Sequence, residues 1–471
     1  MTKTYDLIII GGGAAAFAAA NTANRLKKKT LIINDQDILP LGGTCVNVGC
    51  VPSKIMLHQG ALSYYAQRNR FRALKIRAEA DFMEALKETR EMVLAFQEKN
   101  YGQVIAKQEF VDFKEGHGTF KDAHTVAVGE EEFHTDHILI ASGASTHIPP
   151  IKGIASIDYL TNKSLFFDLK TRPKSVIILG GGAEAMEFSQ IFHHFGIPVT
   201  VIQRSKRILT KHDADIANEL QSILEEEGII IHTGTSIREV TKDGDSIMVH
   251  FDKEGTGEMK ITAERLFMAQ GLRPHTDTMG IDASGVQLDE RGFVKVDEHL
   301  QTNQAHIYAA GDVTGIMPLE TVAAKQGSIA AGNMFGQEKL TIDYQSIPHA
   351  VFTSPQVAAV GITEEEFMRK YRVCLCRTIS WKHVEKAVAI KEDKGILRMV
   401  IDPRTKVVLG VHVVGPLAAD IITTAAYAIR NKMTIYDIRD TVHVFPTLSE
   451  VIKKAAQSFD QNLDDMACCV E

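Results

Sequence analysis

The sequence predicts an α/β protein with two strand–glycine turn–helix units and a C-terminal α+β domain. The first unit begins with an apolar strand at 5–10 and a glycine turn at 11–13. The second unit repeats this order with a strand at 175–179 and glycines at 180–182. From residue 341 onward, alternating apolar segments and later helices are typical of a mixed domain. A chain of 471 residues also exceeds what one hydrophobic core usually supports.

The composition is that of a globular protein and excludes several other classes. Hydrophobic residues make up 45% and charged residues 24%. A net charge of -7 gives no general attraction for nucleic acid or anionic lipid. The uncharged run at 7–20 is interrupted by three glycines, and no other apolar run approaches the roughly 20 residues of a membrane helix. Six cysteines in so long a chain predict a reducing compartment, so we expect a cytoplasmic protein.

The first glycine turn fits the G-x-G-x-x-G/A pattern of a Rossmann-like dinucleotide-binding unit. Gly11 permits the tight turn, Gly13 lets pyrophosphate approach the backbone, and Ala16 allows close packing of the helix. The phosphate would lie at the positive N-terminus of that helix. The next strand, 30–33, leads to Asn34 where an acidic residue usually binds the ribose. We expect Asn34 or the adjacent Asp35 to make this hydrogen bond.

The second unit carries a different residue at the corresponding position. Gly180 and Gly182 repeat the turn, and Gln203 lies as far beyond Gly180 as Asn34 lies beyond Gly11. Arg204 and two further cations follow Gln203. A missing carboxylate beside cations suits a ribose 2′-phosphate, which favours NADPH over NADH. The alternative is a solvated basic turn.

The domain boundaries are predicted from the turns that end three strands. Ser142-Gly143 follows the strand at 138–140, and Gly271 lies where the second unit ends. A later strand at 307–310 ends in Gly-Asp, where Asp312 could hold a cofactor hydroxyl. The second unit is therefore inserted in the first. The predicted domains are 1–148 with 270–337, 149–269, and 338–471.

The most distinctive stretch of the sequence is 42–54. It sets Cys45 and Cys50 five positions apart among glycines, with Lys54 close behind. A lone cysteine pair is often a structural disulfide or part of a metal site. The pattern here is more restrictive than a lone pair and favours a redox-active pair. A thiolate near the N-terminus of a following helix has a lowered pKa, and we expect Cys45 to be the more accessible sulfur. The segment 55–107 is rich in helix formers and predicts long amphipathic helices.

Taken in order, these motifs resemble the flavoprotein disulfide reductase family over essentially the full length. The resemblance implies FAD in the first unit, NADPH in the second, and a C-terminal dimerisation domain that completes the active site of a homodimer. It also implies that Lys54 and Glu187 form an ion pair beside the isoalloxazine ring. The expected cofactor-binding residues are Gly11, Gly13, Ala16, Asn34, Asp35, Gly43, Thr44, Lys54, Ser142, Gly143, Asp312, Gly180, Gly182, Glu187, Arg204 and Gly271.

Within that family, the sequence of residues 44–56 is most similar to the corresponding sequence of the mercuric reductases. Disulfide reductases place a proton-shuttling histidine before Pro-Thr in the C-terminal domain, and Phe445 stands there instead. His443 lies two residues upstream and remains an alternative. Tyr101 matches one of two active-site tyrosines of mercuric reductases, whereas Thr447 occupies the position of the other.

The chain ends in a vicinal pair, Cys468-Cys469, which suits capture of a soft metal ion. The resulting hypothesis is an NADPH-dependent enzyme that reduces Hg(II) to Hg(0). The partner subunit's tail would collect Hg(II) from small thiols and pass it to Cys45 and Cys50. The alternatives are a reductase of a small or lipoamide-like disulfide, and a flavin-carrying sensor of soft metals without turnover. The remaining pair, Cys374 and Cys376, is interpreted as structural.

Overall fold

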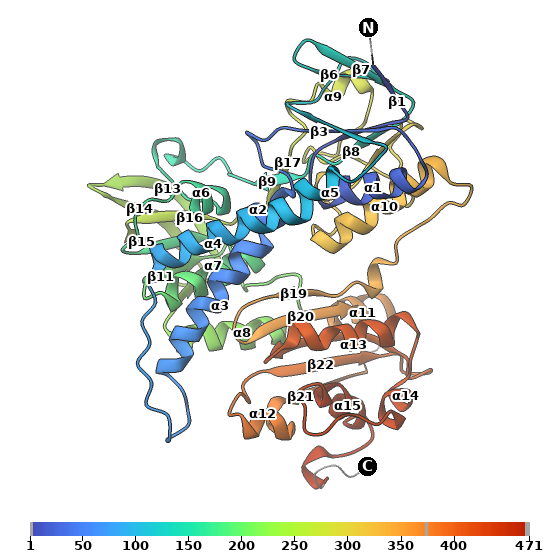
Figure 1. Cartoon of the computed structure of the whole chain (residues 1–471). Helices are drawn as coiled ribbons and strands as arrows, with labels where there is room; N and C mark the ends of the chain where they lie inside the picture. The colour runs from blue at the N-terminus through green and yellow to red at the C-terminus, as the bar shows by residue number, and fades with distance from the viewer. Residues whose placement is uncertain (1–2, 373–374, 467–471) are drawn as a thin grey trace.

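The computed structural model describes residues 3–372 and 375–466. Two α/β units, each built on a parallel sheet, lie above a third domain built on an antiparallel sheet (Figure 1). This is the predicted fold class: two Rossmann-like domains and a C-terminal α+β domain.

The first unit is organised around the parallel sheet β18-β8-β2-β3-β4. Its central strand β2 is buried on both faces, and alternate residues of that strand contribute to two separate cores. Strand β18 comes from beyond the second unit, so the chain returns to its first sheet. The helices and strands of this unit are β1 (Lys3–Tyr5), β2 (Leu7–Ile10), α1 (Ala14–Arg25), β3 (Thr30–Asn34), α2 (Gly43–Asn47), α3 (Cys50–Gln67), α4 (Phe82–Gln97), a π-helical turn (Glu98–Gly102), α5 (Gln103–Ile105), β4 (Val111–Glu115), β5 (Thr119–Phe120), β6 (Thr125–Val128), β7 (Glu131–Thr135), β8 (Ile138–Ile140), β9 (Ala144–Thr146), β17 (Leu272–Pro274), α9 (Ile281–Ser284), β18 (Ile307–Ala309) and α10 (Glu320–Phe335).

The second unit has the parallel sheet β12-β11-β10-β16 and an antiparallel three-stranded sheet, β13-β14-β15. It lies in sequence between β9 and β17, which pair with each other in the first unit. The boundaries given above remain our proposal. The elements are α6 (Asn162–Phe167), β10 (Val176–Leu179), α7 (Ala183–His194), β11 (Val199–Ile202), α8 (Ala214–Glu227), β12 (Ile230–His232), β13 (Thr235–Asp243), β14 (Ser246–Lys253), β15 (Gly257–Ala263) and β16 (Arg265–Met268).

The two glycine turns have the same backbone geometry, as the internal repeat predicts. Gly11 has a φ of 123° and Gly180 a φ of 131°. A Cβ at Gly11 would lie 2.1 Å from the Ala141 carbonyl oxygen, and a Cβ at Gly180 would lie 2.1 Å from that of Ala269. Only glycine fits both the conformation and the space, because each turn is packed against a neighbouring strand end.

The third domain is built on the antiparallel sheet β19-β20-β23-β22-β21. Apolar residues of this sheet and of α13 and α15 form one core. The elements are β19 (His349–Val351), β20 (Gln356–Gly361), α11 (Glu364–Tyr371), β21 (Cys376–Ser380), α12 (Glu385–Ala389), β22 (Ile396–Ile401), β23 (Val408–Gly415), α13 (Ala418–Arg430), α14 (Ile435–Asp440) and α15 (Glu450–Gln457).

The helical segment expected at 55–107 differs from the prediction at both its start and its middle. Helix α3 already begins at Cys50, and residues 68–81 between α3 and α4 are not helical. Asp81 begins α4 as its N-cap, accepting hydrogen bonds from the backbone N–H groups of Met83 and Glu84. A capping carboxylate of this kind marks a new helix start, which the periodicity alone does not show.

A search of the helices in 3–372 and 375–466 found none both long and apolar enough to cross a bilayer.

Candidate functional site

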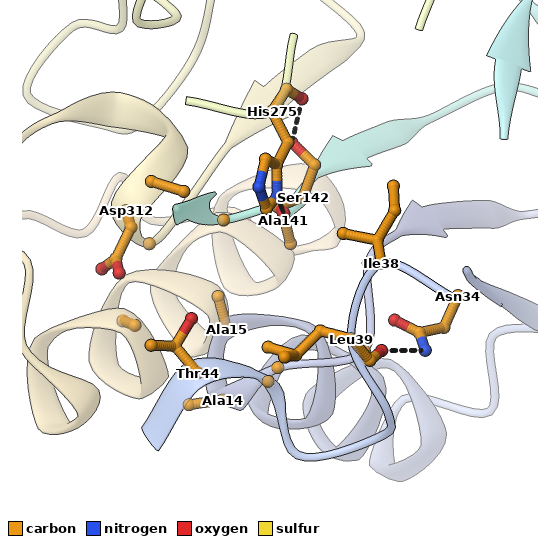
Figure 2. A pocket seen from close by; sticks show the side chains of 18 of the residues that line it. Ala14, Ala15, Asn34, Ile38, Leu39, Thr44, Ala141, Ser142, His275 and Asp312 are labelled. Atoms are coloured by element: carbon orange, nitrogen blue, oxygen red, sulfur yellow. Dashed lines mark hydrogen bonds between the residues drawn. The ribbon is translucent and has the colours of Figure 1, made fainter. Parts of the chain in front are cut away.

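An elongated cavity runs through the first unit, from the end of β3 to the cysteine pair. Residues from strand ends, helix starts and connecting loops surround it, and Figure 2 shows Asn34, Thr44, Ser142 and Asp312 around it. Its lining includes Gly11, Gly13, Asn34, Asp35, Gly43, Thr44, Cys45, Cys50, Ser142, Gly143, His275, Asp312 and Glu320.

The backbone comes unusually close together at the middle of the cavity. Gly43 has a φ of 65°, and a Cβ there would lie 2.9 Å from Gly13 Cα. Gly13 is the N-cap of α1, whose first backbone N–H groups have no partners within the helix. The turn therefore offers a narrow, positively polarised surface that suits pyrophosphate.

Polar groups at the two ends of the cavity fit an extended dinucleotide such as FAD. At one end, Asn34 Nδ2 donates to the Leu39 carbonyl oxygen at 3.1 Å, which fixes the side chain at the cavity wall (Figure 2). The neighbouring Asp35 Oδ2 lies 3.1 Å from His117 Nδ1. At the other end, burial raises the pKa of Asp312 to about 6. Such a buried carboxyl group is suited to binding a ligand hydroxyl.

The two cysteines lie on separate helices at the far end of the cavity. Cys45 lies in α2 and Cys50 is the first residue of α3. Both are free thiols in this structure. The Cys45 thiol donates a hydrogen bond to the Cys50 sulfur; this bond lowers the pKa of Cys50, assisted by the Lys54 charge, and raises the pKa of Cys45. Cys50 is thus the sulfur of the pair whose ionisation is favoured.

The expectation that Cys45 is the more accessible sulfur refers to a pair with flavin lying against Cys50, and it stays a prediction. Cys50 is exposed, whereas Cys45 is half-buried. The reason is geometric: Cys50 opens α3 at the cavity, while Cys45 lies in α2 and contacts further side chains.

Lys54 and Glu187 form the expected ion pair across two units. Lys54 Nζ lies 2.7 Å from Glu187 Oε2, and the Glu187 side chain is 7% exposed. Glu187 Oε1 accepts a hydrogen bond from the Phe352 backbone N–H at 2.9 Å, and Lys54 Nζ lies 4.5 Å from the centre of the Phe352 ring. Glu187 therefore joins α3, α7 and the segment after β19.

Tyr101 lies beside the cysteine pair, next to a residue that the sequence reasoning missed. Its hydroxyl donates to Glu320 Oε1 at 3.4 Å, and its ring packs edge-on against Phe17. The charge of Glu320 also raises the pKa of both Cys45 and Cys50, which places its carboxyl group close to the pair. The only sequence signal was an acidic first residue of a helix, which is common without any function.

The second unit displays only part of the predicted cation cluster. Gly180 and Gly182 form the turn before α7, and Arg204 is exposed just beyond β11. Lys206 pairs with Glu254 at 2.9 Å, and the Arg207 guanidinium donates to the Thr210 carbonyl oxygen. Arg204 and Lys206 are both exposed, and Lys206 is engaged with Glu254.

Other predicted residues lie in the surrounding framework. Ala16 is fully buried under the first turn, and Ser142 Oγ donates to the His275 carbonyl oxygen at 2.9 Å (Figure 2). Gly271 adopts a φ of 106° at the exit of the second unit.

The C-terminal candidates belong to the third domain. His443 Nδ1 lies 2.9 Å from the carbonyl oxygen of Thr441, two residues earlier in the chain, and Phe445 is 43% exposed. Thr447 donates its backbone N–H to Glu450. Cys376 Sγ donates to Glu364 at 3.2 Å, in keeping with a structural role. Cys374, Cys468 and Cys469 lie outside the described residues.

Within 3–372 and 375–466, no group of three or more His, Cys, Asp or Glu side chains has the geometry to hold a metal ion. The two sulfurs of Cys45 and Cys50 are therefore the soft donors that this part of the chain offers at the cavity. Two sulfurs suit an ion that accepts linear coordination.

Comparison with known proteins agrees with this geometry. The chain is 36% identical to a mercuric reductase of Bacillus cereus over 466 residues, covering 99% of this chain and 73% of that protein. It is 31% identical to a dihydrolipoyl dehydrogenase of Mycobacterium bovis, covering 96% and 97%. Among solved structures, the HOCl-induced flavoprotein disulfide reductase RclA from Escherichia coli superposes with a TM-score of 0.86 at 26% identity, covering 96% of this chain and 99% of that one.

Residues 347–456 match the dimerisation domain of the pyridine nucleotide-disulphide oxidoreductases, which supports a homodimer. Residues 5–327 match the main domain of the same family, and the chain therefore belongs to the pyridine nucleotide-disulphide oxidoreductases.

Proposed function

We propose that this flavoprotein is an NADPH-dependent reductase of Hg(II). In the balanced reaction, a bis-thiolate complex of Hg(II), NADPH and one proton give Hg(0), two thiols and NADP⁺. FAD, when bound in the cavity, carries the two electrons from NADPH to the acceptor site. The residues that would hold it are the turn at 11–13, Asn34 or Asp35, Thr44 and Asp312.

Each side chain around the cysteine pair has a defined task in this proposal. Lys54 places a positive charge next to Cys50 and stabilises negative charge that develops at the end of the cavity. Glu187 fixes the position of Lys54. Cys50 supplies a thiolate, and Cys45 supplies the second sulfur for a linearly coordinated ion.

The observation that carries the metal assignment is the pairing of Phe445 with a vicinal cysteine tail. A phenylalanine side chain cannot shuttle protons for a dithiol, whereas Cys468 and Cys469 offer a second soft-metal ligand pair. We propose that the partner subunit's tail receives Hg(II) from small thiols and transfers it to Cys45 and Cys50 by ligand exchange. The similarity to a mercuric reductase along 99% of the chain supports this assignment.

NADPH is the proposed electron donor because Gln203 replaces the usual acidic residue and Arg204 is exposed beside it. We place the nucleotide along the turn at 180–185, with its 2′-phosphate at Arg204. A cytoplasmic location follows from the same proposal, since a nicotinamide nucleotide and reduced thiols are available there.

Two other acceptors are supported by specific observations. The dihydrolipoyl dehydrogenase similarity favours a small disulfide. A structure described as the Cu(II) complex of RclA, which superposes with a TM-score of 0.86, favours Cu(II). The third possibility is a flavin-carrying sensor that binds soft metals without turnover.

Steady-state oxidation of NADPH by the holoenzyme separates these possibilities. We expect stimulation by Hg(II) in excess thiol, with release of Hg(0), and loss of this activity in the Cys468→Ala/Cys469→Ala variant. Parallel assays use Cu(II) and the disulfide of lipoamide, and NADH replaces NADPH as the donor control. Turnover with a disulfide or Cu(II) but not Hg(II) would refute the proposal. Hg(II) binding without NADPH oxidation would identify a sensor.

A further inference from the structure

Glu320 carries a fixed charge that no step above uses. It is the first residue of α10 and lines the cavity beside Cys45. Helix α10 lies so close to α1 that a Cβ at Gly327 would lie 2.0 Å from the Ala15 carbonyl oxygen. Gln326 of the same helix accepts a hydrogen bond from the Gly311 backbone N–H at 2.7 Å. The rigid packing of α10 therefore fixes the position of the Glu320 carboxylate.

The surroundings of this carboxyl group act in opposite directions. Burial is the largest influence and raises the pKa of Glu320, and the hydrogen bond from the Tyr101 hydroxyl at 3.4 Å partly opposes that shift. The Tyr101 hydroxyl is a donor, which a carboxylate accepts well. The N-terminus of α10 adds a favourable dipole.

The charges around the cysteine pair do not cancel. Lys54 is the cation beside the sulfurs, and Glu187 neutralises it at 2.7 Å. Glu320 remains as a further negative charge and raises the pKa of both Cys45 and Cys50. Asp312 adds to this potential, because its charge raises the pKa of Glu320. The acceptor end of the cavity is thus negatively charged, more so when Cys50 is a thiolate.

We propose that Glu320 determines specificity for the charge of the electron acceptor, so that the site favours cationic acceptors over anionic ones. A cation relieves the repulsion between the carboxylate and the sulfurs, whereas an anion increases it. This inference deepens the proposed function, and it relies on that function only for Hg(II) as the acceptor. It applies equally to metal complexes and to disulfides, because both must approach the same two sulfurs.

The experiment compares acceptors that differ in charge but react in the same way. Hg(II) is offered as its complex with cysteamine, which is cationic, or with mercaptopropionate, which is anionic. Disulfides are offered as cystamine and dithiodipropionate, with hydroxyethyl disulfide as the neutral reference. For each pair, the measured quantity is the ratio of kcat/KM for the cationic acceptor to that for the anionic acceptor.

We expect wild type to favour the cationic member of each pair and Glu320→Gln to reduce the ratio about tenfold. Glu320→Asp keeps the charge and should retain most of the preference. Glu290→Gln removes a charge at an exposed position outside the cavity and serves as the control. The visible spectrum of the bound flavin, and its reduction by NADPH, report whether each variant is folded and loaded.

Salt provides a second measurement that needs no variant. Raising the ionic strength should weaken the preference of wild type, because an electrostatic preference is screened. An equal ratio in wild type and Glu320→Gln, or equal losses of the ratio in Glu320→Gln and in the control Glu290→Gln, would overturn the inference. A salt-independent ratio would do the same.

The two proposals fail in different ways. If Hg(II) gives no turnover but cystamine is preferred through Glu320, the function proposed above is wrong and this inference stands. If Hg(II) is reduced with no dependence on ligand charge, the function stands and the inference is wrong.

Discussion

At the scale of single residues, the hydrogen bond from Cys45 favours ionisation of Cys50 over ionisation of Cys45. That bond is the largest cause of the lowered pKa of Cys50, and the charge of Lys54 is a smaller one. The effects of two substitutions, Cys45→Ala and Lys54→Met, on the pKa of Cys50 can therefore be ranked in advance. Both raise the pKa of Cys50, but loss of the hydrogen bond should raise it more than loss of the cation.

The first prediction concerns the pH dependence of Cys50 alkylation. Because a lowered pKa keeps Cys50 ionised to lower pH, removing either cause shifts the alkylation midpoint upward. We expect a larger upward shift in Cys45→Ala than in Lys54→Met, measured by mass spectrometry of the peptide that contains Cys50. Cys376→Ala, in the third domain, is the control. A midpoint unchanged in Cys45→Ala would contradict this account.

Glu187 is the residue at which the two units and the third domain meet, and the second prediction follows from this. Glu187→Ala leaves the Phe352 backbone N–H without its acceptor and Lys54 without its partner. We expect a loss of about 1–3 kcal/mol in the free energy of unfolding. Glu187→Gln retains an acceptor oxygen and should lose less. Chemical denaturation of the flavin-loaded protein measures both, and equal losses would show that the Phe352 contact contributes little.

Some residues of the site could be identified from the sequence and others could not. Gly11, Cys45 and Lys54 lie in local patterns whose spacing has a direct chemical meaning. Glu320 has no such pattern, because its contact with Cys45 depends on how α10 packs against α1. Such a contact is a property of tertiary packing, and the spacing of residues along the chain does not reveal it.

At the scale of elements, a buried polar cluster joins the second unit to the third domain. His212 precedes α8, His349 begins β19, and His412 lies in β23, with Asp213 beside His412. His412 Nε2 lies 3.6 Å from Asp213 Oδ2, and the rings of His212 and His349 are 5.0 Å apart. Burial lowers the pKa of His212 to about 3 and that of His349 to about 4, and it also lowers the pKa of His412.

The third prediction is that acid destabilises this interface. The ordinary pKa of histidine is 6.5, so between pH 6.5 and about 4 the unfolded chain binds protons that the folded His349 does not. Stability is therefore fully present above this window and falls as the pH falls, by at most about 1.4 kcal/mol per pH unit for each group.

Variants of the cluster provide the test. His349→Gln should lose less thermal stability than wild type between about pH 7 and about pH 5, because one such group is removed. His58→Gln, at an exposed position, serves as the control. If wild type and His349→Gln lost the same amount, the cluster would not be the source of acid lability.

Elements with strong local signals were predicted well, and the exceptions have a physical cause. The strands beside the glycine turns lie where the sequence predicts them. The sequence predicts more than one helix over 55–107 but not where they separate, because helix formers continue through 68–81 and the start of α4 depends on the Asp81 cap. Likewise, no pattern predicts the histidine cluster, since its members come from three separate elements.

At the scale of the whole molecule, the third domain exposes apolar side chains that a lone subunit would leave in water. Val442 is 92% exposed, Val444 76% and Tyr427 64%. Exposed groups of this kind mark protein interfaces, and residues 347–456 match a dimerisation domain. A shared active site would explain why Phe445 lies in this domain rather than in the cavity.

The last prediction tests sharing of the active site directly. A Cys45→Ser chain has an intact tail, and a Cys468→Ala/Cys469→Ala chain has an intact redox pair. We co-express them with two different affinity tags and isolate the heterodimer. If each tail serves the partner's cysteines, one of the two sites contains a complete set, and Hg(II)-dependent NADPH oxidation should recover to about half of wild type. The two parental homodimers, each with no complete site, are the controls. If each tail served its own subunit, neither site would be complete, and the heterodimer would stay as inactive as its parents.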